Sequence, residues 1–223
     1  MKATNKAWIG KLEAAASTLL CGGAGLYFLW GASPSPRWSE GASFARAVST
    51  LGLQEAPGYS GSILWSQLFT QLPLGSLSFR LSVASASALG IASLLFFHSL
   101  LRAIPTLTRL SPLANIDLSF AASLWLILSP GWGLCATQAS PQAFSLLLAC
   151  TFLFSGLRLQ LEGAGGRLRW QAATLGSWTA MLASDMPLSL ITLPSLLLLL
   201  SHKSSERSTA RLSPSFLFGG AGL

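Results

Sequence analysis

The stretch LSVASASALGIASLLFFHSLL, residues 81–101, decides the fold. It contains no Asp, Glu, Lys or Arg, and an α-helix of about 20 such residues crosses the hydrocarbon core of a bilayer. Small residues gather in its first half, namely Ser85, Ala86, Ala88 and Gly90. Small side chains let neighbouring helices approach closely inside a membrane. The stretch therefore predicts a transmembrane helix packed within a bundle.

The composition of the whole chain points the same way. Of its 223 residues, 51% are hydrophobic and only 9% are charged, whereas a soluble domain carries about 25% charge. The surplus apolar surface must face lipid, so a bilayer is the expected surrounding. The formal net charge of +7 does not indicate a nucleic-acid partner, because the basic residues lie at the ends of apolar runs rather than in one patch.

Five further apolar runs predict an all-α integral membrane protein with about six transmembrane helices. They are residues 14–30, about 116–130, 142–157, 170–184 and 188–201.

The two ends of this series need an interpretation of their own. A cleaved signal peptide with its cleavage site near Ala32 is the alternative for the first run. The aromatic end of that run (Tyr27, Phe28, Trp30) favours an uncleaved span instead, since such residues suit the membrane interface. Residues 213–223 look like the start of a further span that is cut short.

Positive charge orients the predicted spans. With the N-terminus in the cytoplasm, eleven of the 14 Lys and Arg residues fall on the cytoplasmic side: Lys2, Lys6, Lys11, Arg102, Arg109, Arg158, Arg167, Arg169, Lys203, Arg207 and Arg211. The outer side holds Arg37, Arg46 and Arg80. This asymmetry satisfies the positive-inside rule. It predicts a cytoplasmic segment 1–13, a transmembrane domain 14–201 and a basic cytoplasmic segment 202–223, in a bacterial inner membrane or an equivalent one.

The only long connection, residues 31–80, is then extracytoplasmic, and long loops often carry function. Residues 43–53 predict a short amphipathic helix, because Phe44, Ala47, Val48 and Leu51 follow helical spacing. Residues 63–72 predict a second one, ended by Pro73 and Gly75. We expect both helices to lie on the membrane surface.

Few acidic residues are available for chemistry. Glu40, Glu55 and Asp185 all fall on the predicted outer side, Asp185 within a tight turn between the last two spans. A carboxylate beside apolar surface can act as a general base, although pairing with a neighbouring arginine explains Glu40 or Glu55 equally well. Glu13 is interpreted as surface charge, and His98 has no partner at metal-ligand spacing. No metal site is predicted.

Residues 39–86 carry a series of short motifs. In chain order they read Glu40-Gly41-Ala42-Ser43, Thr50-Leu51-Gly52, Glu55-Ala56-Pro57-Gly58-Tyr59, Leu72-Pro73-Leu74-Gly75 and Phe79-Arg80-Leu81-Ser82-Val83-Ala84-Ser85-Ala86. Their order and spacing resemble those of the protein O-mannosyltransferase-like family within the GT-C superfamily of polytopic membrane glycosyltransferases. Bacterial members of this family carry a domain-of-unknown-function name. The resemblance implies that the chain corresponds to the N-terminal part of such a protein.

The resemblance implies transfer of a sugar from a polyprenyl-phosphate carrier to an acceptor, protein or glycan, on the outer face of the membrane. Glu40 matches the expected catalytic acid, with Glu in place of the usual Asp. Arg80 is expected to hold the leaving phosphate. The further positions expected to bind substrate are Glu55, Pro57, Gly58, Tyr59, Gln142 and Asp185. The sequence names neither sugar nor acceptor, and it leaves a requirement for a divalent cation open.

Several positions depart from the family pattern. Ser43 replaces a second acidic residue, Glu55 a histidine, Gln142 a glutamate and Phe144 a tyrosine, while Asp185-Met186 stands loosely where an Asn-His pair is expected. The scaffold therefore matches better than the chemistry. The alternative to an active enzyme is a degraded or truncated relative that serves as a subunit or has no activity. A transporter has less support, since no inverted repeat is evident.

Overall fold

The computed structural model describes the chain except for residues 1, 36–38, 52–58, 109, 162–165 and 202–223. Every regular element in the described residues is an α-helix. The helices are α1 (Lys2–Gly31), α2 (Ser39–Thr50), α3 (Ser60–Thr70), α4 (Leu77–Leu107), α5 (Pro112–Leu128), α6 (Pro130–Thr137), α7 (Gln142–Leu161), α8 (Arg167–Ser184) and α9 (Met186–Ser201).

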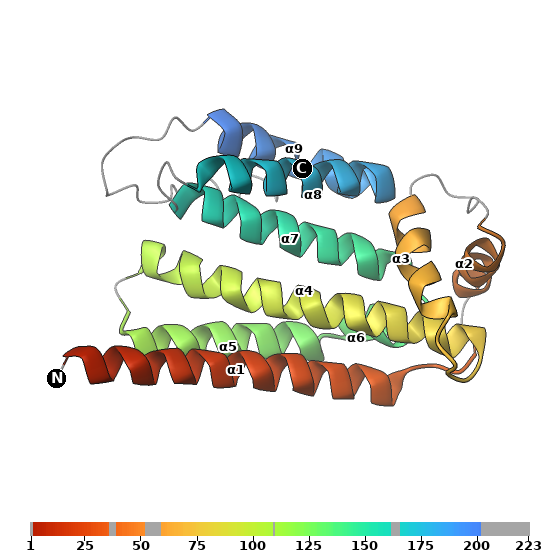
Figure 1. Cartoon of the computed structure of the whole chain (residues 1–223), viewed down its shortest axis with the longest axis horizontal. Coiled ribbons are helices and arrows are strands. Elements are labelled where there is room, and N and C mark those ends of the chain that lie inside the picture. The colour runs from red at the N-terminus through yellow and green to blue at the C-terminus, as the bar shows by residue number, and fades with distance from the viewer. Residues whose placement is uncertain (1, 36–38, 52–58, 109, 162–165, 202–223) are drawn as a thin grey trace.

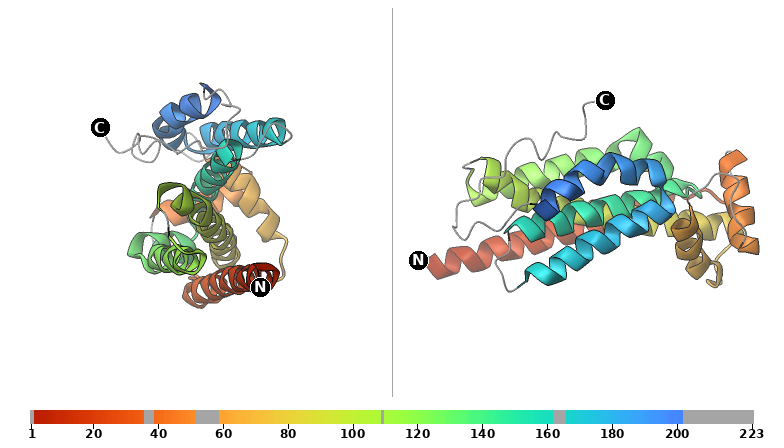
Figure 2. Two further views of the ribbon diagram at one scale, coloured as in Figure 1. Left: turned by 90° about the vertical axis from the view of Figure 1, so that its left-hand side faces the viewer. Right: turned by 90° about the horizontal axis from the view of Figure 1, so that it is seen from above.

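The longer helices run back and forth between the two ends of an elongated bundle (Figure 1). Successive passes are made by α1, α4, α5 with α6, α7, α8 and α9, whereas α2 and α3 lie at one end (Figure 2). We call this end, which α2 and α3 occupy, the α2–α3 end. The other end, where α1 begins and α4 finishes, is the opposite end.

Three helices are long and apolar enough to cross a membrane: residues Ala7–Gly31 of α1, α4 and α7. Taken together, the consecutive helices α5 and α6 are also long and apolar enough to cross a membrane. The two helices are bent by 62° relative to each other. The last apolar helix, Met186–Leu199 within α9, is shorter, and α8 is not among the helices that meet the criteria. By length and composition the described residues thus contain three to four candidate spans, against about six predicted.

Serine residues set the start of three helices. In each case the hydroxyl accepts a hydrogen bond from the amide three residues later, which satisfies one of the free amides of the first turn. The caps are Ser76 for α4, Ser111 for α5 and Ser129 for α6. Pro112 and Pro130 follow the last two caps, at the first helical position where proline is tolerated.

The segment after the predicted third span differs from expectation. We expected a connection between residues 130 and 142, yet α6 continues after the break at Ser129. The Trp132 side chain is only 8% exposed, and its Nε1 donates a hydrogen bond to Ser93 Oγ of α4 at 3.2 Å. Ala136 is fully buried. The third pass is therefore a bent pair of helices rather than one short span.

Helix α4 lies at the centre of the bundle and packs against α1, α3, α5, α6 and α7. Its small residues Ala84, Ser85, Ala88 and Gly90 are all buried. This confirms the prediction that residues 81–101 pack within a bundle, because small side chains let several helices approach one backbone.

The surface of the bundle carries more large apolar side chains than that of a soluble protein. The buried polar side chains among the described residues are all serine or threonine, and many bond to carbonyls of their own helix. The core is otherwise apolar, yet large apolar side chains are also exposed, for example Trp125 (82%), Leu26 (73%) and Leu197 (59%). Such surface is stable only against lipid, so the structure supports the predicted bilayer surrounding.

Candidate functional site

Most of the predicted site positions that the structure describes gather at the α2–α3 end. Tyr59 precedes α3, Arg80 lies in the first turn of α4, Gln142 begins α7, and Asp185 separates α8 from α9. Glu40 is the second residue of α2, but its side chain lies outside the described part. Glu55, Pro57 and Gly58 also lie outside the described residues.

The start of α3 is fastened to α7 and α8 by two serines. Ser60 Oγ donates to the Ala183 carbonyl at 2.9 Å, and Ser62 Oγ donates to the Pro141 carbonyl at 2.6 Å. Gly61 between them leaves no room for a side chain, because an added Cβ would meet Ser184 Oγ and lie 2.9 Å from Phe144 Cε1. The Ser-Gly-Ser sequence thus brings α3 against two later helices.

Two aromatic residues extend this contact. Trp65 of α3 stacks on Phe144 of α7 with ring centroids 5.6 Å apart, and its Nε1 donates to the Ala84 carbonyl of α4 at 3.0 Å. Phe144 is the position where the family pattern has tyrosine. Sequence reasoning placed Trp65 on a surface helix and missed this contact, since the two residues belong to distant segments. The contact gives Phe144 a packing role.

Arg80 forms the best-defined polar cluster of this end. Its guanidinium donates from Nη1 to the Thr70 carbonyl at 2.8 Å, from Nε to the Leu74 carbonyl at 2.8 Å and from Nη2 to the Gly75 carbonyl at 3.3 Å. Gly75 has a φ of +43°, a left-handed conformation that favours glycine. Two motifs of the family series, Leu-Pro-x-Gly and Phe-Arg, are therefore bonded to each other.

Asp185 and Gln142 also make contacts that stabilise the fold. Asp185 Oδ1 accepts a hydrogen bond from the Leu188 amide at 3.1 Å, as an N-terminal cap of α9 does. Gln142 is exposed, and its Oε1 accepts a weak hydrogen bond from Cys135 Sγ at 3.6 Å. The break at Asp185 agrees with the predicted turn.

Helix α2 is amphipathic, with one apolar face against the protein core and one exposed polar face. Phe44, Ala47 and Val48 are buried, as their spacing predicted, and the exposed face carries polar residues such as Arg46 and Ser49. The prediction for Leu51 is wrong: its side chain is 62% exposed, and the residue has a φ of +49° just after the last helical residue. Helix α2 therefore begins and ends earlier than predicted.

Helix α3 has the reverse polarity. Its buried residues are Ser62, Ile63 and Ser66, whereas Leu64 and Leu68 are 65% and 68% exposed. Exposed leucines one turn apart, opposite buried serines, indicate a helix face that contacts acyl chains. The two short helices of this end thus differ: α2 presents a polar face suited to water, and α3 presents an apolar face suited to lipid.

This difference gives a direct prediction. A spin label on Leu64→Cys is expected to be more accessible to oxygen, which concentrates in lipid, than to a water-soluble nickel chelate. A label on Ser49→Cys of α2 is expected to show the reverse. Both variants would carry alanine at Cys21, Cys135 and Cys150, so that a single site is labelled. Equal nickel accessibility at the two positions would contradict a lipid-facing α3.

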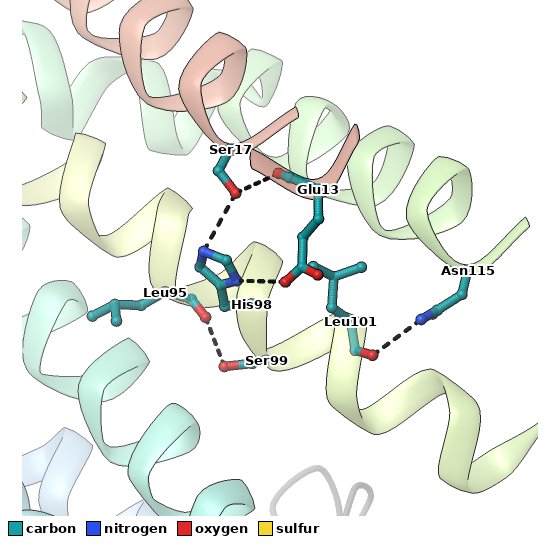
Figure 3. Close-up of polar contacts among 7 residues, drawn as sticks. All are labelled: Glu13, Ser17, Leu95, His98, Ser99, Leu101 and Asn115. Carbon is teal, nitrogen blue, oxygen red and sulfur yellow. Dashed lines mark hydrogen bonds and ion pairs between the residues drawn. The ribbon is translucent and has the colours of Figure 1, made fainter. Parts of the chain in front are cut away.

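The opposite end holds a second polar cluster, which joins α1 to α4 (Figure 3). Glu13 Oε1 lies 3.7 Å from His98 Nδ1, which makes an ion pair when His98 is protonated. Ser17 Oγ donates to the Glu13 carbonyl at 2.8 Å and lies 3.4 Å from His98 Nε2. Asn115 Nδ2 of α5 donates to the Leu101 carbonyl nearby at 3.0 Å.

The sequence alone treated Glu13 as surface charge and His98 as a residue without a ligand partner. Their contact is long-range, since His98 follows Ser17 by 81 residues. Among the described residues, no three His, Cys, Asp or Glu side chains lie close enough to hold a metal ion.

Comparison of the chain with family models, curated proteins and solved structures finds no match. The resemblance to glycosyltransferases rests on the motifs of residues 39–86 themselves.

Proposed function

We propose that the chain is a GT-C type membrane glycosyltransferase that moves a sugar from a polyprenyl-phosphate donor to an extracytoplasmic acceptor. The observation that carries the proposal is that Tyr59, Arg80, Gln142 and Asp185 all lie at the α2–α3 end, as does the helix that carries Glu40. Segments that are distant in the sequence thus bring the expected site positions to one end of the bundle, as a single site for donor and acceptor requires.

The surroundings of the site suit both substrates. A polyprenyl donor stays in the lipid, and Leu64 and Leu68 of α3 present an apolar face to it. The acceptor comes from water, which the polar face of α2 suits. A site between two such helices is where a lipid-linked sugar and a water-soluble acceptor can meet.

The proposed orientation puts the α2–α3 end outside the cytoplasm. The opposite end receives the helix termini that carry Lys11, Arg102, Arg158, Arg167 and Arg169. The positive-inside rule favours this side as the cytoplasmic one.

The proposed chemistry is a single displacement at the anomeric carbon. The acceptor hydroxyl attacks that carbon while the Glu40 carboxylate takes the hydroxyl proton. The bond between the carbon and the phosphate oxygen breaks, and its electron pair leaves with the polyprenyl phosphate. A new glycosidic bond forms, and the proton is later released to water.

A non-catalytic role on the same scaffold is the second candidate. It is favoured by the structural use of residues expected to bind substrate: Arg80 holds a turn, Asp185 caps α9 and Phe144 packs on Trp65. In that case the chain would act as a subunit of another membrane protein.

A glycan comparison separates the two candidates. Cells with the gene are expected to carry hexose additions on surface proteins or glycans, detected by mass spectrometry, which are lost when the gene is deleted. Expression of the full natural chain in the deletion strain should restore them. Identical glycans in all three strains would overturn the enzymatic proposal and favour the subunit role.

A further inference from the structure

Three arginines gather on two aromatic rings at the opposite end of the bundle. Cζ of Arg102 and Cζ of Arg158 lie 5.4 Å and 5.5 Å from the ring centroid of Phe154. Cζ of Arg158 and Cζ of Arg169 lie 5.3 Å and 5.6 Å from the centroid of Trp170. The two rings meet edge to face at 5.9 Å. We call these five residues the arginine–aromatic cluster.

The cluster concentrates positive charge. Each aromatic ring attracts guanidinium groups to its face. Two arginines share each ring, so their positive charges are held near one another. Among the described carboxylates of this end, Glu13 lies 3.7 Å from His98, and Asp117 of α5 is exposed. Glu162 follows α7 in the sequence and lies outside the described residues.

The arginines have donors to offer an anion. Arg102 and Arg158 make other contacts as well. Arg169 is exposed at the start of α8, and a guanidinium carries five N–H donors. Planar guanidinium groups match the oxygens of a phosphate.

The cluster lies near the ends of three helices. Arg102 stands five residues before the end of α4, Arg158 three before the end of α7, and Arg169 two after the start of α8. At the helical rise, these positions are about 3 to 8 Å from the helix ends. Since α4 and α7 are candidate spans, a lipid site at the cluster requires these helix ends to lie near the head groups of one leaflet.

Apolar surface accompanies this charge. Leu161, at the end of α7, is 43% exposed, and Leu168, in the first turn of α8, is 80% exposed. A phospholipid could place its phosphate on the arginines and its acyl chains on the exposed leucines. Free phosphate could contact only the arginines.

We propose that the arginine–aromatic cluster binds the phosphate of an anionic phospholipid of the adjacent leaflet. Basic pockets between transmembrane helices bind such head groups. The head group of a zwitterionic phospholipid also carries a positively charged group, which the three arginines would repel. The lipid site does not depend on the proposed sugar transfer, because it needs only a membrane-embedded chain.

Native mass spectrometry of the full chain, delipidated in detergent, tests the proposal. Phosphatidylglycerol is expected to bind more tightly than phosphatidylcholine. Replacing Arg102 and Arg158 by glutamine should weaken phosphatidylglycerol binding by about fivefold for each arginine removed. Arg46→Gln, which removes an exposed arginine from α2 at the other end, is the matched control and should change nothing.

Each other outcome overturns the proposal. Equal binding of the two lipids, or unchanged binding in the double variant, would show that the cluster selects no anionic lipid. Displacement of the lipid by millimolar inorganic phosphate would show a free-anion site instead. If the double variant does not fold, Arg169→Gln carries the test, because Arg169 is exposed at the start of α8. Unchanged lipid binding in that variant would likewise overturn the proposal.

Discussion

Replacing Glu40 by glutamine is expected to lower the rate of sugar transfer by about 10²- to 10⁴-fold. Glutamine keeps the size of the side chain but cannot take the proton of the acceptor hydroxyl. The rate would be measured as release of polyprenyl phosphate from a panel of labelled polyprenyl-phosphate hexoses, in membranes that contain the full chain. Immunoblotting would establish equal amounts of each variant.

Two further variants make this result specific. Glu40→Asp keeps a carboxylate and supplies the residue that the resembled family usually has, so it should retain much of the activity. Asp117→Asn removes an exposed carboxylate from α5, near the opposite end, and should leave the rate unchanged. Full transfer by Glu40→Gln would remove Glu40 from the mechanism. Equal loss in Asp117→Asn would point to a general effect of lost charge.

A carboxylate at this position also has a structural explanation. Glu40 lies in the first turn of α2, where a negative charge is stabilised by the helix dipole. That effect is worth under about 1 kcal/mol at an exposed site, and it would change the stability of α2 rather than the chemical step. Measuring the rate at matched folded protein therefore separates the two roles.

The features predicted well are those that composition and local spacing determine. The uncharged stretch 81–101 is a buried helix at the centre of the bundle, and Phe44, Ala47 and Val48 form the buried side of α2. Apolar length and helical periodicity act within a single segment. They can therefore be evaluated without knowing what the segment packs against.

The features missed depend on contacts between segments. Ile63 looked like part of the apolar face of a surface helix, together with Leu64 and Leu68. It is buried instead, because the serines of α3 bind Ala183 and Pro141 and hold that side of the helix against the bundle. The contact of Glu13 with His98 arises in the same way, through packing of α1 on α4. No spacing rule within one segment reports either partner.

In the candidate site, too, some features could be predicted from the sequence and others depend on contacts that the sequence does not report. The resemblance identified residues 39–86 as the segment to examine, and the described motifs of that segment do lie at one end of the bundle. It assigned Arg80 to a leaving phosphate, because a cation at a helix start suits that role. The three backbone carbonyls that Arg80 meets come from residues 70–75, and carbonyl acceptors leave no mark in a sequence. The geometry thus gives Arg80 a positioning role.

Replacing Arg80 by lysine is expected to destabilise the fold by about 2 to 4 kcal/mol, since hydrogen bonds from a charged donor contribute about 1.5 to 3 kcal/mol each and are not additive. Lysine keeps the charge, but its ammonium cannot reach three carbonyls in the fork geometry of a guanidinium. The free energy of unfolding would be measured by circular dichroism in mixed micelles. Hydrogen exchange should become faster over residues 70–76, the turn that Arg80 holds.

The same variant decides between the two roles of Arg80. If the guanidinium positions the turn, Arg80→Lys loses stability and local protection, while the KM for the lipid donor changes little once rates are normalised to folded protein. If it instead holds the leaving phosphate, stability is kept and the donor interaction weakens. Arg46→Lys, an exposed arginine on α2, should alter neither quantity. Because three carbonyl oxygens already face the Arg80 guanidinium, a phosphate would have to compete with them, so we expect the first result.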